Sequence, residues 1–222
     1  VSINLCSNGI TNEGCKHLAE ALERNSTISK LYLFNNEAIG PSGCWLIAKA
    51  ADPRQVSLET KLAFCDALIS LLRNDPQFTT CRFVRSYFGD EGCVYLCEAF
   101  QGNSHLTNFD IPFNKVESLG SARLAEALKA NSSVHTLNLS NNYIGGQGCQ
   151  CLAEALKTNS TMTYICIDHN EIYDAGCQYL CEAFQHNSSL TFIDMSNNDI
   201  RVKGAKHLAD AHKVNFTITT VN

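Results

Sequence analysis

The chain has 222 residues, of which 45% are hydrophobic and 18% charged, a composition that excludes wholesale disorder. Its formal net charge is −5, from 17 basic and 22 acidic residues, which gives no sign of a basic surface for nucleic acid or anionic lipid. From this charge we predict no nucleic-acid partner. No apolar run approaches 18 residues, so we also predict no membrane-spanning segment.

The first predicted element is a short strand within residues 2–8, because apolar residues alternate with polar ones before an asparagine. The same pattern, x-L-x-L-x-x-N, recurs along the chain. Its first apolar anchors are Ile3, Leu31, Cys81, Phe109, Leu137, Ile165, Ile193 and Val221. Consecutive anchors are 28 residues apart, except that 50 residues separate the second from the third. This spacing predicts seven repeats and the start of an eighth.

A helix is predicted after each strand. The clearest copy begins at Gly148, where Leu152, Ala153 and Leu156 form the buried stripe of an amphipathic helix. Asn-Ser closes the helix, and asparagine suits this place because it tolerates the left-handed conformation. One strand and one helix cannot bury both apolar faces alone, so we expect the repeats to stack.

One interruption separates the second anchor from the third. The helix from Gly43 is followed by a polar stretch, Arg54 to Thr60, and by a second helical segment, Lys61 to Asn74. We interpret residues 53–74 as a helical insert, either a degenerate partial repeat or an extra helix on the convex side. Insertions in solenoids usually lie on one face and sometimes bind partners.

The full pattern, L-x-x-L-x-L-x-x-N-x-I-x-x-x-G-x-x-x-L-A-E-A-L, resembles the ribonuclease-inhibitor-like class of leucine-rich repeats. That class includes ribonuclease inhibitor, Ran GTPase-activating protein, the sensor domains of NOD-like receptors, and several cytoskeletal and axonemal proteins. The resemblance implies an α/β solenoid, or horseshoe, with a parallel β-sheet on the concave face and α-helices on the convex face. We therefore expect residues 1–222 to form a single leucine-rich-repeat domain, as a fragment of a longer protein.

Twelve cysteines are present, and most recur at equivalent positions. Five directly follow the helix-opening glycine, where other repeats carry serine or alanine: Cys15, Cys44, Cys93, Cys149 and Cys177. We interpret them as small buried residues, not as disulfides or metal ligands. The i,i+4 pairs formed with Cys97 and Cys181 lack the further ligands of a structural zinc, so no metal and no cofactor are predicted. Reduced thiols favour a cytosolic or nuclear compartment. We predict a cytoplasmic location, with the cytoskeleton or the axoneme as alternatives.

Asparagine recurs at the ends of the strands and of the helices. The strand-ending residues should align into a ladder in which Ser86 is the exception: Asn8, Asn36, Asn114, Asn142, Asn170 and Asn198. Six N-x-[ST] sequons begin at Asn25, Asn131, Asn138, Asn159, Asn187 and Asn215. Five of them are helix-ending asparagines, so we interpret these residues as caps and not as glycosylation sites.

Residues that flank the buried anchors should face the concave side and meet a partner. Two clusters stand out because exposed aromatic and arginine residues dominate interface hot spots. The first cluster contains Tyr32, Phe34, Arg82, Arg85, Asp110 and Phe113, expected on three successive strands. The second, acidic cluster contains Tyr164, Asp168, His169, Phe192 and Asp194. The repeat with Asn138, Ser140 and Asn141 has no such residue and serves as an internal control.

No phosphate loop, zinc-protease motif or nucleophile elbow is present, and we interpret Asp168-His169 as a surface pair, so no catalytic residue is predicted. The expected function is a non-enzymatic scaffold that binds a protein partner through its concave face. One alternative is the ligand-sensing or autoinhibitory repeat domain of a NOD-like receptor. Another is a regulator of a small GTPase.

Overall fold

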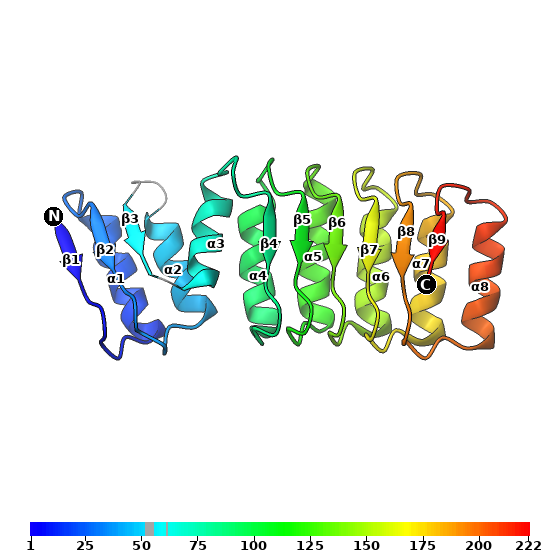
Figure 1. The fold of residues 1–222 in the computed structure, drawn as a ribbon, viewed down its shortest axis with the longest axis horizontal. Helices are drawn as coiled ribbons and strands as arrows, with labels where there is room; N and C mark the ends of the chain where they lie inside the picture. The colour runs from blue at the N-terminus through cyan, green and yellow to red at the C-terminus, as the bar shows by residue number, and fades with distance from the viewer. Residues whose placement is uncertain (52–55, 61) are drawn as a thin grey trace. The chain divides into compact units, whose positions relative to one another are not determined.

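The computed structural model describes residues 1–51, 56–60 and 62–222. They form two compact units, Val1–Pro76 and Gln77–Asn222. In each unit short parallel strands form a sheet, and the helices that connect them pack on one of its faces (Figure 1). The other face, which we call the open face, carries the residues that flank the anchors.

The first unit contains three strand–helix pairs. Its elements are β1 (Ser2–Asn4), α1 (Asn12–Arg24), β2 (Lys30–Tyr32), α2 (Pro41–Ala51), β3 (Ser57–Glu59) and α3 (Ala63–Leu72). The three strands are parallel and lie in the order β1-β2-β3. Ile3 pairs with Leu31, which in turn pairs with Leu58.

The segment predicted as a helical insert supplies a strand as well as a helix. Strand β3 pairs with β2 along its whole length, so this segment forms a short repeat of its own. Its polar sequence conceals the strand, because Leu58 is the single apolar residue of β3 and no strand-ending asparagine follows. Residues 52–55 and Lys61, which include parts of the predicted polar stretch and helix, lie outside the described residues.

The second unit contains five strand–helix pairs and a final strand. Its elements are β4 (Thr80–Arg82), α4 (Gly89–Phe100), β5 (Asn108–Asp110), α5 (Ser118–Ala130), β6 (Thr136–Asn138), α6 (Gly145–Leu156), β7 (Tyr164–Cys166), α7 (Tyr173–Phe184), β8 (Phe192–Asp194), α8 (Val202–His212) and β9 (Thr220–Val221). The strands follow one another in chain order. Register is constant at 28 residues, as Phe109 paired with Leu137 illustrates.

The core of the second unit lies between the sheet and its helices. The anchors Phe109, Leu137, Ile165 and Ile193 are fully buried against the leucines of the helix stripe. The rings of Phe100 and Phe109 pack with their centroids 4.9 Å apart. Each repeat thus buries its apolar residues against the next one, as a solenoid requires.

The predicted asparagine ladder is confirmed. Asn142 is 2% exposed, and its amide nitrogen donates to the carbonyls of Ile111 (3.1 Å) and Leu139 (2.9 Å). Its side-chain oxygen accepts the backbone N–H groups of Asn114 and Val116, both at 3.0 Å. Asn142 therefore joins its own turn to the preceding repeat, whereas Asn8, in the first repeat, bonds within its own turn.

The helix-ending asparagines work differently from the prediction. Asn131 has a φ of −88° and is not left-handed. Its amide nitrogen instead donates across the stack to the carbonyls of Phe100 (3.0 Å) and Asn103 (2.8 Å), and its oxygen accepts from Ser133 and Val134. A second ladder results. A glycan on this nitrogen would break two buried hydrogen bonds, in agreement with a structural role for the sequon.

The cysteines are free thiols, and ten of the twelve are buried. Cys93 and Cys97 lie with their sulfur atoms 3.9 Å apart, and so do Cys177 and Cys181. Burial raises the pKa of the Cys81 thiol, which stays protonated within the core. These thiols pack as small residues, as predicted.

Candidate functional site

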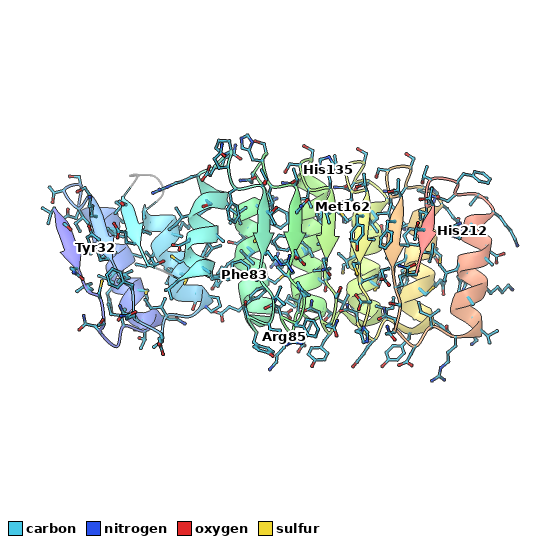
Figure 2. The ribbon with its side chains drawn as sticks, viewed as in Figure 1. Tyr32, Phe83, Arg85, His135, Met162 and His212 are labelled. Carbon is cyan, nitrogen blue, oxygen red and sulfur yellow. The ribbon has the colours of Figure 1, made fainter. Side chains whose placement is uncertain are left out.

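The turns that leave the strands of the second unit gather at one edge of its sheet. We call them the exit turns, and they comprise residues 84–88, 112–116, 140–144, 168–172 and 196–200. Because the strands are parallel, every turn begins at the same edge. Figure 2 shows Arg85 at this edge and His135 at the opposite one.

Each exit turn contains a left-handed residue four places after the anchor, and all but that of β6 contain a second one, at Tyr87, Lys115, Glu171 or Asp199. The residues four places after the anchor, with φ between 52° and 59°, are Arg85, Phe113, Asn141, His169 and Asn197. Asparagine adopts this conformation readily, whereas other side chains clash with the backbone. Three repeats therefore carry a large side chain at a place that suits asparagine.

Two cations in these turns lie over rings of a neighbouring turn. The Arg85 guanidinium lies 4.8 Å from the centroid of the Phe113 ring, and the Lys115 ammonium lies 5.2 Å from that of Tyr87. Both contacts join the turns of β4 and β5. The exit turns of β4 and β5 thus place two cations against aromatic rings.

Asp110, on the open face of β5, has an unsatisfied acceptor. Its Oδ2 lies 3.2 Å from Arg82 Nε, while its Oδ1 is buried and has no hydrogen-bond partner among the described residues. In sister strands this oxygen accepts the backbone N–H two residues later, as Asp194 does from Ser196 at 2.9 Å. Pro112 takes that place after Asp110 and has no N–H to donate.

An aromatic pair lies on the open face of β7 and β8. Tyr164 and Phe192 pair directly across the strands, with ring centroids 4.4 Å apart and an interplanar angle of 2°. Both residues are half-buried. The neighbouring strands carry Thr136 and Thr220 in register, so the pair is an isolated aromatic patch.

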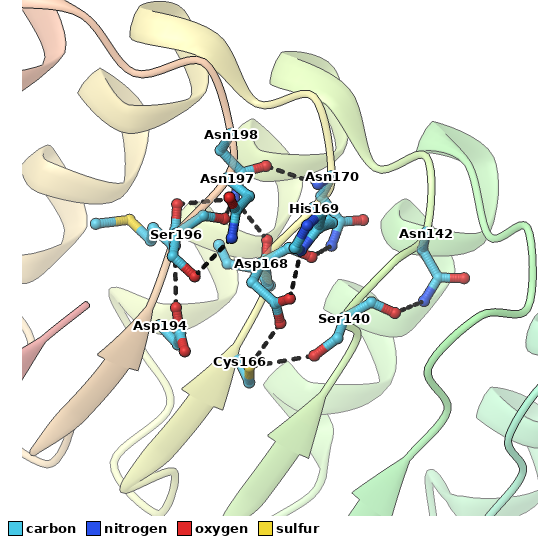
Figure 3. Close-up of polar contacts among 12 residues, drawn as sticks. Ser140, Asn142, Cys166, Asp168, His169, Asn170, Asp194, Ser196, Asn197 and Asn198 are labelled. Carbon is cyan, nitrogen blue, oxygen red and sulfur yellow. Dashed lines mark hydrogen bonds and ion pairs between the residues drawn. The ribbon is translucent and has the colours of Figure 1, made fainter.

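Polar contacts link β6, β7 and their exit turns (Figure 3). The Ser140 hydroxyl lies 3.2 Å from the Cys166 thiol, which donates to Asp168 Oδ1 over 3.1 Å, and His169 Nδ1 lies 2.8 Å from Asp168 Oδ2. Burial raises the pKa of the Cys166 thiol to about 11, so it remains a donor. Burial also acts to raise the pKa of Asp168, but hydrogen bonds from Ser140, His169 and Cys166 outweigh it and lower that pKa. Asp168 is therefore an ionised acceptor at neutral pH.

The structure brings the second predicted cluster together, on β7, β8 and their exit turns. Tyr164 and Phe192 stack, and Asp168 bonds to His169 beside them. Asp194 pairs in register with Cys166 on the same face. Whether this surface binds a partner remains a prediction.

The first predicted cluster does not lie on three successive strands, and this expectation is wrong because β3 pairs with β2. Tyr32 lies beside Phe34, with ring centroids 6.4 Å apart, and pairs in register with Glu59 of β3. The other members belong to β4, β5 and their exit turns: Arg82, Arg85, Asp110 and Phe113. Strand β3 occupies the place next to β2 that the sequence had assigned to β4.

The exit turns also present residues that sequence reasoning missed. Tyr87 and Tyr143, in the exit turns, are 60% and 54% exposed, and Tyr173, the first residue of α7, is 48% exposed. Strand alternation does not predict the direction of side chains six and eight places after the anchor, so these tyrosines carry no signal in the sequence pattern. The supposed control repeat is not neutral either, because Ser140 joins the Asp168 contacts and Tyr143 projects from its turn.

A hollow of about 290 Å³ lies among the exit turns of β5 to β8. It is lined by Phe113, Asn141, Asn142, Tyr143, His169, Glu171, Asn197 and Asp199. In the described part of the chain, no three His, Cys, Asp or Glu side chains converge to hold a metal ion. No described helix has the length and apolar character needed to cross a membrane.

Sequence comparison identifies repeats of the same kind in known proteins. Residues 130–153 and 186–209 match the family model described as Leucine Rich repeat. NACHT, LRR and PYD domains-containing protein 5 of Homo sapiens is 32% identical over 112 residues, which are 50% of this chain and 8% of that protein. The match therefore spans a small part of this relative.

Two solved structures have a similar fold. Leiomodin-1 Actin-Binding Site 2 is 21% identical with a TM-score of 0.59, and the match covers 68% of this chain and 88% of that one. The tropomodulin C-terminal domain of Caenorhabditis elegans is 15% identical with a TM-score of 0.59, and the match covers 69% and 93%. Residues 130–153 and 186–209 are therefore leucine-rich repeats, and the stacked strand–helix repeats of the described residues are similar in fold to these two domains.

Proposed function

We propose that the chain is a non-enzymatic interaction domain that binds a protein partner through the open face and exit turns of its second unit. The observation that carries the proposal is the left-handed backbone of Arg85, Phe113 and His169. Each costs roughly 1–2 kcal/mol where asparagine costs little. The contact of Arg85 with Phe113 stabilises the fold by only about 0.5–1 kcal/mol at an exposed site. Side chains that weaken the fold in this way favour a role in binding.

The aromatic pair on the open face supports the same surface. Tyr164 and Phe192 stack on each other and leave a flat, half-buried platform between threonine-bearing strands. Tyrosine is enriched among interface hot spots, and burial of such rings supplies much of the binding energy. A partner would remove the remaining exposed ring surface from water.

The thiols support a cytoplasmic location for this interaction. All twelve cysteines are free, and such a number of unpaired thiols is typical of a reducing compartment. Cytoskeletal or axonemal association is one form of this proposal. The similarity in fold to Leiomodin-1 Actin-Binding Site 2 makes actin a partner to include in the binding tests.

The test compares two phenylalanines of the second unit. Partners captured with the wild-type chain are purified and titrated against Phe192→Thr, which introduces the residue of the neighbouring strands, and against Phe216→Ser. Phe216 is 85% exposed, and sister turns carry serine there, so it is a matched control away from the proposed surface. We expect Phe192→Thr to raise the Kd about thirtyfold and Phe216→Ser to leave it unchanged. Equal effects of the two changes would contradict the proposal.

A second candidate is the repeat region of a NOD-like receptor. The observation that favours it is the 32% identity over 112 residues with NACHT, LRR and PYD domains-containing protein 5. The complete coding sequence tests it, because this candidate requires a nucleotide-binding domain with a phosphate loop in the same polypeptide.

A further inference from the structure

We propose that the hollow among the exit turns of β5 to β8 receives a lysine or arginine side chain of the protein partner. This inference rests on the proposed function and names the chemistry that the partner presents at the edge of the binding surface. Three features of the hollow support it: its carboxylates, its aromatic wall and the pattern of the neighbouring turns.

The carboxylates of Glu171 and Asp199 line the hollow without a basic partner among the described residues. They hold equivalent positions in successive repeats, so their backbones are about one strand spacing, roughly 4.8 Å, apart. Like charges on neighbouring turns repel each other, and a cation between them reduces the repulsion. The lining includes no lysine or arginine, and His169 is occupied by its contact with Asp168.

The aromatic wall comprises Phe113 and Tyr143. The outer face of Phe113 already holds the Arg85 guanidinium. Tyr143 is 54% exposed, and among the described side chains no cation lies over its ring. Its ring is therefore open to a cation that arrives with a partner.

The neighbouring turns show what is missing beside Tyr143. In the turn of β4, Tyr87 has the ammonium of Lys115, the equivalent residue of the next turn, 5.2 Å from its ring centroid. In the sequence, Tyr143 corresponds to Tyr87 two repeats later and Glu171 corresponds to Lys115, although Tyr87 has a left-handed backbone (φ 51°) and Tyr143 does not. The hollow thus combines an aromatic ring with two carboxylates where the fold itself supplies a lysine elsewhere. A basic side chain from outside complements it in charge and in ring contact.

The probe is a fluorescein-labelled peptide of twelve residues in which arginine alternates with glycine and serine, compared with a counterpart that carries glutamate for arginine. Fluorescence anisotropy at physiological ionic strength measures the Kd for the wild-type chain, for the double variant Glu171→Gln/Asp199→Asn and for Tyr143→Ala. The matched control is Glu98→Gln/Glu126→Gln, which removes the same charge from a hollow of about 220 Å³ that contains its own Arg123, 3.0 Å from Glu126.

We expect the wild-type chain to prefer the basic peptide, and the double variant to raise its Kd roughly tenfold, since each exposed charge contact contributes up to about a factor of five. Tyr143→Ala should weaken binding by a similar or smaller factor, and the control should change the Kd less than twofold. Equal losses in the two double variants, no loss in either, or no saturable binding by the wild type would each overturn the inference. Thermal unfolding of each variant excludes misfolding as the cause.

The two proposals fail separately. Suppose that Phe192→Thr abolishes binding of a captured partner, while Glu171→Gln/Asp199→Asn changes the Kd of neither the partner nor the basic peptide. The interaction surface is then supported and the cation site is refuted. Suppose instead that binding of the basic peptide requires Glu171 and Asp199, while Phe192→Thr leaves the Kd of the partner unchanged. The cation site is then supported and the open-face platform is refuted.

Discussion

Replacement of Asn142 by alanine is the most direct test of how the repeats are joined. The side chain makes five hydrogen bonds in a buried position, and alanine can make none of them. The carbonyl of Leu139 keeps a second donor, Asn170, at 2.9 Å. The N–H groups of Asn114 and Val116 lose the acceptor that Asn142 provides, and each unsatisfied buried donor costs about 1–3 kcal/mol. We therefore expect Asn142→Ala to lower the free energy of unfolding by about 3 kcal/mol or more.

The matched control is Asn8→Ala, at the equivalent position of the first repeat. Asn8 is exposed, and its amide bonds only to carbonyls of its own turn, those of Leu5 (3.0 Å) and Cys6 (3.1 Å). Water replaces such bonds, so this change should cost less than about 1 kcal/mol. Urea unfolding followed by circular dichroism measures both variants against the wild type. If the two variants lose the same stability, the ladder does not join repeats as the hydrogen bonds indicate.

Three further predictions follow from the exit turns and the thiols. Phe113→Asn and His169→Asn should maintain or raise the melting temperature, because asparagine adopts the left-handed conformation with less strain. Both changes should weaken partner binding. A clear loss of stability in both variants would contradict the strain argument. Thiol titration of denatured protein without reductant should find all twelve thiols, whereas in native protein Cys6 and Cys151, the two that are not buried, should react first; quantitative disulfides would overturn the packing account. The lowered pKa of Asp168 means that its ionised form stabilises the folded state above pH ~4 and that this contribution is lost as the pH falls through the folded-state pKa. The stability difference between wild type and Asp168→Asn should therefore shrink below pH ~4 in acid titrations, and a difference that stays constant down to pH ~2 would refute the assignment.

Part of the candidate site could be predicted from the sequence. Tyr164 and Phe192 could be placed side by side because both precede an anchor and the register is 28 residues, so the pairing follows from counting. Tyr143 and Glu171 could not, because strand alternation says nothing about the direction of side chains beyond the strand. Their exposure depends on turns whose left-handed residues vary from repeat to repeat.

The repeat, its register and the asparagine ladder follow from the sequence, since each depends on a local pattern that every stacked repeat carries. Leu137 pairs with Ile165 for the same reason that Phe109 pairs with Leu137. Only the tertiary structure decided that Leu58 belongs to a strand, because β3 is defined by its pairing with β2 and not by its own polar sequence. It also decided that Asn131 bonds to the preceding repeat, since its partners lie 28 and 31 residues away along the chain and come within reach only when the repeats stack.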